Sequence, residues 1–230
     1  MEIHGIQKLT LLDYPGHTAC TVFTGRCNFR CPFCHNASLV LRPREQPMVE
    51  PKELYALLQK RRGLLDGVCI TGGEPTLQKD LPQLCETIKT LGFDVKLDTN
   101  GTNPALLASL MEKKLVDYVA MDIKTSREQY GRVCGIPDYD TAPVEESAQL
   151  LISGNVSYEF RTTLVRELHD KADIHAIGAW LKGAKAYFLQ GFRDSGDLIA
   201  SGLSALSREE MESYTDILRR YIKNVQMRGI

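Results

Sequence analysis

Long apolar runs are missing from this 230-residue chain, and so is an excess of charge of either sign. No stretch approaches the ~20 apolar residues that a membrane-spanning helix needs. Residues Met1–His4 lack the basic and apolar regions of a signal peptide. The formal net charge of −1 gives no strong field to attract nucleic acid or an anionic membrane. The sequence therefore predicts a cytoplasmic protein that binds neither membranes nor nucleic acid.

The cysteine content argues against a secreted domain held together by disulfides. The seven cysteines are an odd number, and three of them fall between positions 27 and 34. Such crowding is typical of a metal site in a reducing compartment. The other four are expected to be small core or surface residues: Cys20, Cys69, Cys85 and Cys134.

Repeats, low-complexity segments and linkers rich in Pro, Gly or Ser are also absent, so we expect a single domain over residues 1–230. What the chain does contain is a recurring unit, in which a short apolar or β-branched run precedes a helical pattern. Such runs suit strands that are buried on both faces. The expected strands are Ala19–Thr24, Gly67–Thr71, Phe93–Asp98, Tyr118–Ile123, Tyr158–Val165 and Lys185–Gln190.

The segments between these strands carry helix signals. Asn103 and Pro104 form an N-cap followed by a proline in the first turn. Ser207 and Glu210 have the spacing of a capping box. The expected helices are Pro51–Arg62, one that opens at Pro104, Val144–Ser153, Asp170–Lys182 and one that opens after Ser207.

Alternation of strands and helices predicts a parallel sheet with right-handed crossovers. The chain has room for about six such units, and its 230 residues fall short of the ~250 that are typical of a closed eight-unit barrel. The predicted fold class is therefore α/β, as an open, partial (β/α)6 barrel of the TIM type. Its active site is expected at the carboxyl ends of the strands.

The strongest chemical signal is a C-x3-C-x2-C motif directly after the first predicted strand, formed by Cys27, Cys31 and Cys34. Thiolates select iron–sulfur clusters, Zn²⁺ or Cu(I). Three cysteines suit a four-iron cluster, because one iron is then left to bind a substrate. The alternative is a structural zinc site that His35 completes. The predicted metal-binding loop spans residues 25–47.

A second motif, Gly72-Gly73-Glu74-Pro75, follows the next predicted strand. Two glycines at a strand end allow the backbone to approach a ligand closely. The Glu74 carboxylate is a suitable acceptor for an ammonium group. The alternative is an ordinary turn, but its position one strand–helix unit after the cysteines favours a ligand site.

In their order and spacing the two motifs resemble those of the radical S-adenosylmethionine (SAM) superfamily. Residues 10–16 (Thr-Leu-Leu-Asp-Tyr-Pro-Gly) and 34–36 (Cys-His-Asn) are similar to enzymes that activate glycyl radical enzymes. Among these, the resemblance is to the activating proteins of anaerobic ribonucleoside-triphosphate reductase and of pyruvate formate-lyase. Residues 97–101 and 121–124 extend the resemblance, which covers about residues 5–200 and is specific up to residue 125.

The resemblance implies one [4Fe–4S] cluster on Cys27, Cys31 and Cys34, with the open iron bound by the amino and carboxylate groups of SAM. Some members of the family also bind a monovalent cation near the end of the third strand. The implied SAM contacts are Phe33 and Asn36 at the adenine or ribose, Gly72, Gly73 and Glu74 at the methionine amino group, Asp98, Thr99 and Asn100 after the third strand, and Asp122 and Lys124 after the fourth.

Three charged residues of the predicted site need a charged partner, and more than one partner is possible for them. Asp122 and Lys124 either contact SAM, with Lys124 at its carboxylate, or form a structural ion pair. Arg161 lies within the fifth predicted strand, where a buried guanidinium needs an anionic partner. The resemblance makes the SAM carboxylate a candidate for that partner.

Three functions are compatible with the sequence. The first is an activase that makes a glycyl radical on a partner, preferably anaerobic ribonucleoside-triphosphate reductase, with pyruvate formate-lyase as the alternative. The second is a radical SAM enzyme that acts on a small molecule such as a deazapurine precursor, and the third is a non-catalytic zinc or iron–sulfur module. The short chain favours the first, because an open barrel mouth suits a protein loop as substrate. Flavodoxin or ferredoxin is the expected electron donor.

Overall fold

The computed structural model describes residues 1–230, which form two compact units. Unit 1 comprises Met1–Asn28 and Ser38–Ala120, and unit 2 comprises Phe29–Ala37 and Met121–Ile230. The chain therefore changes unit twice around the cysteine motif. The single domain over residues 1–230 stays a prediction.

Unit 1 is built on four neighbouring strands. β1 (Ile3–Thr10) pairs antiparallel with β2 (Ala19–Thr24), and β2 pairs parallel with β3 (Gly67–Gly72). β3 in turn pairs parallel with β4 (Asp94–Thr99). In the parallel strands β2 and β3, Val22, Val68 and Ile70 are fully buried, as parallel strands covered on both faces require.

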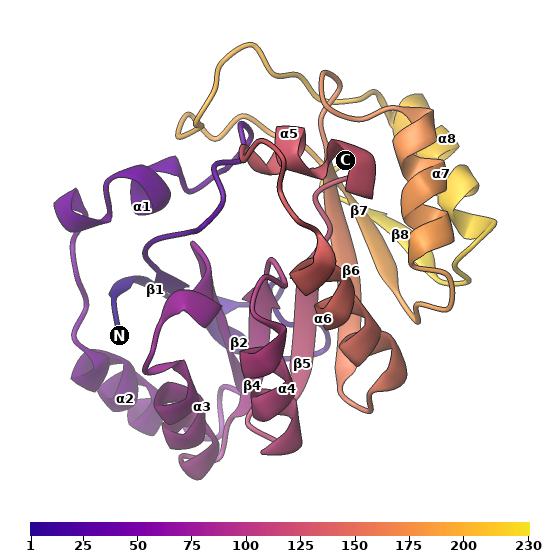
Figure 1. The fold of residues 1–230 in the computed structure, drawn as a ribbon. Helices are drawn as coiled ribbons and strands as arrows, with labels where there is room; N and C mark the ends of the chain where they lie inside the picture. The colour runs from indigo at the N-terminus through magenta and orange to yellow at the C-terminus, as the bar shows by residue number, and fades with distance from the viewer. The chain divides into compact units, whose positions relative to one another are not determined.

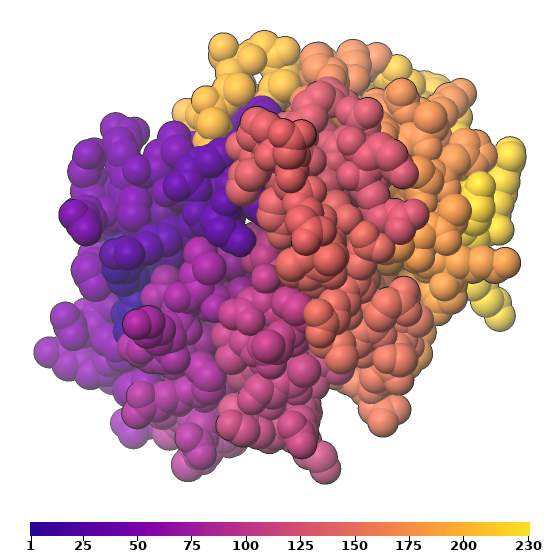
Figure 2. All heavy atoms as spheres, in the orientation of Figure 1, coloured from indigo at the N-terminus to yellow at the C-terminus, as the bar shows by residue number.

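Helices cover these strands. In Figure 1, α2, α3 and α4 lie along one side of the strands of this unit, and Figure 2 shows the surface of the molecule from the same direction. None of the helices in the chain is long and apolar enough to cross a membrane. Several begin with a proline in the first turn, where its missing N–H costs nothing. The helices of this part are α1 (Ala37–Leu41), η1 (Pro43–Glu45), α2 (Pro51–Lys60), η2 (Pro75–Leu77), α3 (Leu81–Thr90) and α4 (Pro104–Glu112).

Unit 2 repeats the parallel arrangement. After β5 (Tyr118–Asp122), which leads into this unit, β6 (Ser157–Leu164), β7 (Tyr187–Gly191) and β8 (Val225–Arg228) pair in parallel. α7 and α8 pack side by side beside β7 and β8 (Figure 1). The helices of this part are η3 (Arg127–Gln129), α5 (Tyr130–Cys134), α6 (Ala142–Ser153), α7 (Lys171–Trp180) and α8 (Arg208–Arg219).

The α/β class with parallel strands is confirmed. Of the six predicted strands, Ala19–Thr24 is present with both ends as predicted, and the other five are present with one or both ends moved by one or two residues. β1 was not predicted, because its burial does not alternate and Gln7, Lys8 and Leu9 are exposed. β8, α1 and α5 are short and were also missed. α3 was missed although Leu81, Leu84, Cys85 and Ile88 are buried at helical spacing.

The predicted capping box at the start of α8 is confirmed. The Ser207 hydroxyl accepts a hydrogen bond from the backbone N–H of Glu210 at 3.2 Å, and the Glu210 carboxylate accepts from the backbone N–H of Ser207 at 2.6 Å. We predict that Ser207→Ala lowers the free energy of unfolding by about 1 kcal/mol, because a helix N–H loses its acceptor. Urea unfolding measures the change. Ser213→Ala, inside the same helix, is the control, and equal losses in both variants would contradict the assignment.

Candidate functional site

The loops that carry the predicted site in unit 1 begin next to one another. β2 and β3 are in register, with Thr24 opposite Gly72. The loop after β2 carries Cys27, the turn after β3 carries Gly73 and Glu74, and the end of β4 carries Asp98. Parallel strands thus bring three motifs that are far apart in sequence to one edge of the sheet.

The two glycines let the turn after β3 pack against the metal-binding loop. The backbone N–H of Gly73 donates to the carbonyl of Thr24, and that of Glu74 donates to the carbonyl of Arg26, both at 2.8 Å. Gly72 has a φ of +113°, and a Cβ there would collide with the backbone of Thr24. A Cβ on Gly73 would collide with the carbonyl of Arg26. The close approach that paired glycines predict is therefore made to the protein's own backbone, while their contact with SAM stays a prediction.

Arg26, directly before Cys27, completes this junction. Its φ of 66° is uncommon for a residue other than glycine, and such strain persists only where the surroundings fix the backbone. Its N–H donates to the carbonyl of Leu39 at 2.9 Å, and its guanidinium pairs with Glu2 at 2.6 Å. The backbone directly before Cys27 is therefore fixed by contacts of Arg26 with both Leu39 and Glu2.

Glu74 is a buried brace between the turn after β3 and the end of β4. One of its oxygens accepts from the N–H and hydroxyl of Thr76, at 3.0 and 2.6 Å, and from the Thr99 hydroxyl at 2.8 Å. The other oxygen accepts from the backbone N–H of Asn100 at 2.7 Å. Only 1% of the residue is exposed, and this burial raises the pKa of the carboxyl while the four donors oppose the rise. The contact of Glu74 with an ammonium group stays a prediction.

Asn100 connects this brace to the first cysteine. Its side-chain amide donates to the sulfur of Cys27 at 3.9 Å and to the Asn28 side chain at 2.9 Å. The Asn28 amide in turn donates to the Thr102 hydroxyl at 2.8 Å. N–H groups directed at a ligand sulfur are one of the means by which proteins set the potential of an iron–sulfur cluster. Sequence analysis did not single out Asn28, although its place next to Cys27 was a usable signal.

Asp98, another predicted SAM contact, is paired inside unit 1. Lys96 forms an ion pair with it, and the Cys69 thiol donates to the same carboxylate oxygen at 3.7 Å. Lys96 was also missed, although a lysine in the apolar run of β4 is an unusual feature.

The other two cysteines of the motif lie in a tight turn of unit 2. The backbone N–H of Cys34 donates to the carbonyl of Cys31 at 3.0 Å. Phe33 between them is 6% exposed and meets the ring of His169 edge-on, with centroids 6.3 Å apart. The carbonyl of Pro32 accepts from Ala200 at 2.9 Å. The turn is thus held by the hydrogen bond between Ala200 and Pro32, and its aromatic residue, Phe33, is buried.

The charge of Lys124 acts on the thiol of Cys34 against the effect of burial. Burial raises the pKa of Cys34, whereas the N–H of Asn36 and the charge of Lys124 lower it. Burial lowers the pKa of Lys124, but Asp122 and the nearby Cys31 together raise it above its usual value. The ammonium of Lys124 thus opposes the effect of burial on Cys34, whose pKa nevertheless stays above its usual value.

Asp122 is the common partner of both predicted basic residues of the site. It pairs with Lys124 at 3.0 Å and with the Arg161 guanidinium at 2.8 Å. Although burial raises the pKa of Asp122, the charges of Arg161 and Lys124 lower it to about 2. The structural ion pair is therefore present, and it supplies the anion that Arg161 needs. Contacts of these residues with SAM stay predictions.

His169, to which the sequence assigned no role, fixes the backbone of Lys124. Its Nε2 lies 2.8 Å from the Lys124 carbonyl, which can only accept, so Nε2 carries the proton. The Val165 N–H donates to Nδ1 at 3.1 Å. Burial lowers the pKa of His169 although its backbone hydrogen bonds raise it, so the ring is neutral at pH 7. No ligand spacing marked this residue in the sequence.

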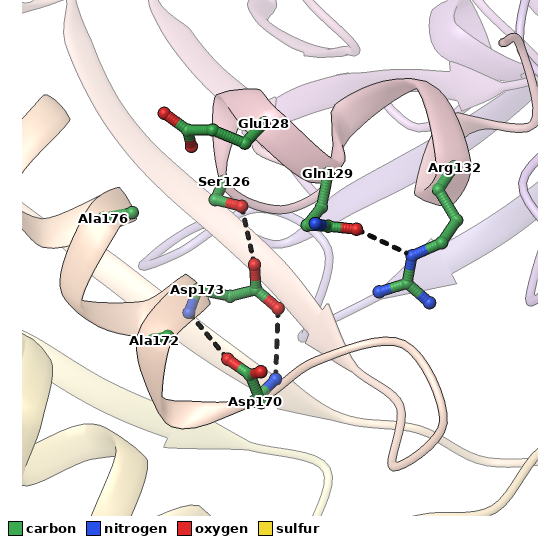
Figure 3. A pocket seen from close by; sticks show the side chains of 8 residues that line it. All are labelled: Ser126, Glu128, Gln129, Arg132, Asp170, Ala172, Asp173 and Ala176. Carbon is green, nitrogen blue, oxygen red and sulfur yellow. Dashed lines mark hydrogen bonds between the residues drawn. The ribbon is translucent and has the colours of Figure 1, made fainter.

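A polar pocket of about 470 Å³ lies next to this segment. Figure 3 shows that most of its polar side chains are paired with one another. Ser126 donates to the buried Asp173 at 2.6 Å, Asp170 and Asp173 form the capping box of α7, and Arg132 donates to Gln129 at 2.9 Å. The hydrogen bond from Ser126 to Asp173 therefore connects the segment after Lys124 to α7.

The metal ligands themselves fall on both units, Cys27 on unit 1 and Cys31 and Cys34 on unit 2. No group of three His, Cys, Asp or Glu side chains in a metal-binding arrangement is found. His35, the candidate fourth zinc ligand, is exposed and stacks on Phe192 with ring centroids 5.7 Å apart. Joint ligation by the three cysteines stays a prediction.

Parallel strands with polar motifs at their carboxyl ends define the class of α/β proteins that bind ligands at that edge. The chain belongs to the radical SAM superfamily, whose family model matches residues 21–176. Membership implies a [4Fe–4S] cluster and SAM as cofactors.

Relatives of known name differ in how much of the chain they match. The chain is 33% identical to a "Putative glycyl-radical enzyme activating enzyme" of Methanocaldococcus jannaschii, across 99% of this chain and 96% of the relative. It is 29% identical to a "Probable GTP 3′,8-cyclase" of Thermococcus kodakarensis, across 56% of this chain and 42% of the relative.

Solved structures show the same fold at low sequence identity. A domain of a pyruvate-formate lyase-activating enzyme from Bacteroides vulgatus matches 71% of this chain and 99% of its own, at a TM-score of 0.58 and 17% identity. SuiB of Streptococcus suis, bound to its precursor peptide, matches 90% of this chain and 48% of its own, at a TM-score of 0.69 and 13% identity.

We predict that Gly73→Ala disturbs the metal-binding loop. A methyl group there displaces the Arg26 carbonyl, and forced overpacking of this kind costs about 1–3 kcal/mol. Thermal unfolding and the iron content after anaerobic reconstitution measure the effect, and both should fall. Gly5→Ala is the control, since a Cβ there meets the Phe23 side chain at an ordinary 3.6 Å. Unchanged stability and iron content in Gly73→Ala would contradict the junction between turn and loop.

Proposed function

We propose that this protein is an activase, which uses SAM to make a glycyl radical on a partner enzyme. The observation that carries the proposal is the similarity to a relative named as a glycyl-radical enzyme activating enzyme, because it extends over almost the whole of both chains. The relatives named as GTP cyclases match only about half of this chain. A small-molecule function therefore has less support.

The residues of the motif fit a [4Fe–4S] cluster. Three soft thiols with no fourth cysteine in the motif leave one iron for SAM. The charge of Lys124 lowers the pKa of Cys34 against the larger effect of burial, and Asn100 offers an N–H to Cys27. When bound, the cluster supplies the electron that cleaves the C5′–S bond of SAM, which gives methionine and a 5′-deoxyadenosyl radical.

The chain's own residues then have to bind and orient SAM. We assign the methionine amino group to the turn of Gly72, Gly73 and Glu74 and the SAM carboxylate to Lys124, with Arg161 nearby. Phe33 and Asn36 border the adenine or ribose. Asp98, Thr99 and Asn100 complete the set at the end of β4, where the Glu74 brace holds the last two.

We propose anaerobic ribonucleoside-triphosphate reductase as the partner. A glycine suits hydrogen abstraction, because the flanking amide groups stabilise its Cα radical and no side chain hinders the approach. The hydrogen atom leaves Cα and ends on the 5′ carbon of 5′-deoxyadenosine. The partner's loop must be ordered to bind, so an isolated peptide binds weakly and the intact partner binds better.

We further propose that flavodoxin or ferredoxin delivers the electron near residues 26–36, and that the protein works in the cytoplasm. A reducing compartment keeps the motif thiols available.

We predict that anaerobic reconstitution yields about four irons and four sulfides per chain. Changing Cys27, Cys31 or Cys34 to Ala removes a ligand and should abolish the cluster. Cys69→Ala and Cys134→Ala are matched controls, because these cysteines are buried outside the motif, and they should retain it. Stoichiometric zinc without sulfide, in protein purified without air, would overturn the proposal.

We also predict a glycyl radical on the partner. Reduced protein, SAM and anaerobic ribonucleotide reductase, mixed without oxygen, should give a doublet in the EPR spectrum. Deuterium placed at the target glycine should pass into 5′-deoxyadenosine, because the abstracted atom moves to the 5′ carbon.

Pyruvate formate-lyase serves as the second partner in the same assay. A doublet only with pyruvate formate-lyase would reassign the partner. If both proteins stay silent while a small metabolite triggers SAM cleavage, the activase assignment is wrong.

A further inference from the structure

A buried lysine stands inside the parallel sheet of unit 1. Lys96 and Asp98 are two residues apart on β4, so both side chains project from the same face of the strand. The Lys96 side chain is 1% exposed and that of Asp98 is 14% exposed. Lysine is almost never this deeply buried unless it is paired.

The contacts of Lys96 converge on one carboxylate oxygen. Its ammonium donates to Oδ1 of Asp98 and to the sulfur of Cys69 at 3.8 Å. Cys69 is the register partner of Lys96 on β3, and its thiol donates to the same Oδ1 at 3.7 Å. Oδ1 of Asp98 therefore accepts hydrogen bonds from side chains of two neighbouring strands, Lys96 on β4 and Cys69 on β3.

Stability alone does not explain this pair. Val95 and Leu97 are fully buried on either side of Lys96, and an apolar residue would fit such a strand. Replacing a buried ion pair by packed apolar residues often leaves a protein as stable or more stable. Asp98 lies near the carboxyl end of β4, where the predicted site is. A function of its carboxylate would explain why a lysine, and not an apolar residue, is buried at position 96.

We propose that Lys96 is the built-in countercation of Asp98, which keeps this carboxylate ionised and oriented for SAM and makes an inorganic monovalent cation unnecessary. The proposal rests on the contact of Asp98 with SAM in the proposed function. Asp122, a second aspartate of the predicted SAM set, is likewise paired, with Lys124 and Arg161 of its own unit. Each of these two aspartates is thus neutralised by basic side chains of its own unit.

The first test uses the unmodified protein with its cluster. SAM is titrated into the reduced protein, and the change in the EPR spectrum of the cluster gives the affinity. The titration is run in potassium, sodium and choline chloride at equal ionic strength, so that general screening is constant. We expect dissociation constants that agree within about twofold. A loss of about tenfold or more in choline would overturn the proposal.

The second test removes the ammonium. Lys96→Met should weaken SAM binding about tenfold or more, the scale of one charge-assisted hydrogen bond, and added K⁺ or ammonium ion should restore part of the affinity. Lys89→Met is the matched control. Lys89 is likewise paired with carboxylates, with Asp94 at 3.2 Å and Asp117 at 2.7 Å, but at the amino end of β4. The Lys89→Met variant should leave the affinity for SAM unchanged and independent of the cation.

A double-mutant cycle separates positioning from simple packing. If Lys96 acts through Asp98, the Lys96→Met/Asp98→Asn variant binds SAM no worse than Asp98→Asn alone. Additive losses, or affinity in Lys96→Met that no cation changes, would contradict the proposal. The double variant also leaves no buried carboxylate without a partner, which protects its folding. SAM binding is measured without any partner enzyme, so a failure of the activase assignment gives a different result.

Discussion

The buried carboxylate of Glu74 is the contact on which the edge of unit 1 depends. It ties the turn after β3 to Thr99 and Asn100 at the end of β4, and Asn100 continues to the sulfur of Cys27. The backbone N–H of the same residue holds the carbonyl of Arg26. One residue therefore joins three segments that sequence motifs mark separately. Removing it would leave several buried donors without an acceptor, and each of these carries a cost of about 1–3 kcal/mol.

Charge around the site is balanced by fixed protein groups. Asp98 is paired with Lys96, and Asp122 is paired with Lys124 and Arg161. His169 stays neutral and fixes the Lys124 carbonyl. Preorganised charges of this kind need little rearrangement when a charged substrate arrives, which is how polar sites lower the cost of chemistry. Each of these charge pairs is held within its own unit, and the contacts of their residues with SAM stay predictions.

The sequence predicted what depends on local patterns. Apolar runs marked the six strands, and the spacing of Ser207 and Glu210 marked a helix start. The motif of Cys27, Cys31 and Cys34 placed the chain in the radical SAM superfamily, which the family model confirms.

Contacts between distant residues could not be predicted from such patterns. Glu74 was predicted to accept from an ammonium group, but its observed donors include Thr99 and Asn100, which only the register of β3 and β4 brings near. Lys96 and His169 were missed for the same reason. Cys69, which Lys96 contacts on β3, and the Lys124 carbonyl that His169 contacts lie far away in the sequence, and single residues carry no spacing signal.

The central claim is that this protein cleaves SAM reductively, and product analysis tests it most directly. Protein that carries its cluster is incubated anaerobically with SAM and dithionite, and the products are quantified by mass spectrometry. We expect 5′-deoxyadenosine and methionine in equal amounts, since one C5′–S bond is broken for each of them. SAM that stays intact in the presence of a reduced cluster, or that is converted to S-adenosylhomocysteine, would contradict the account.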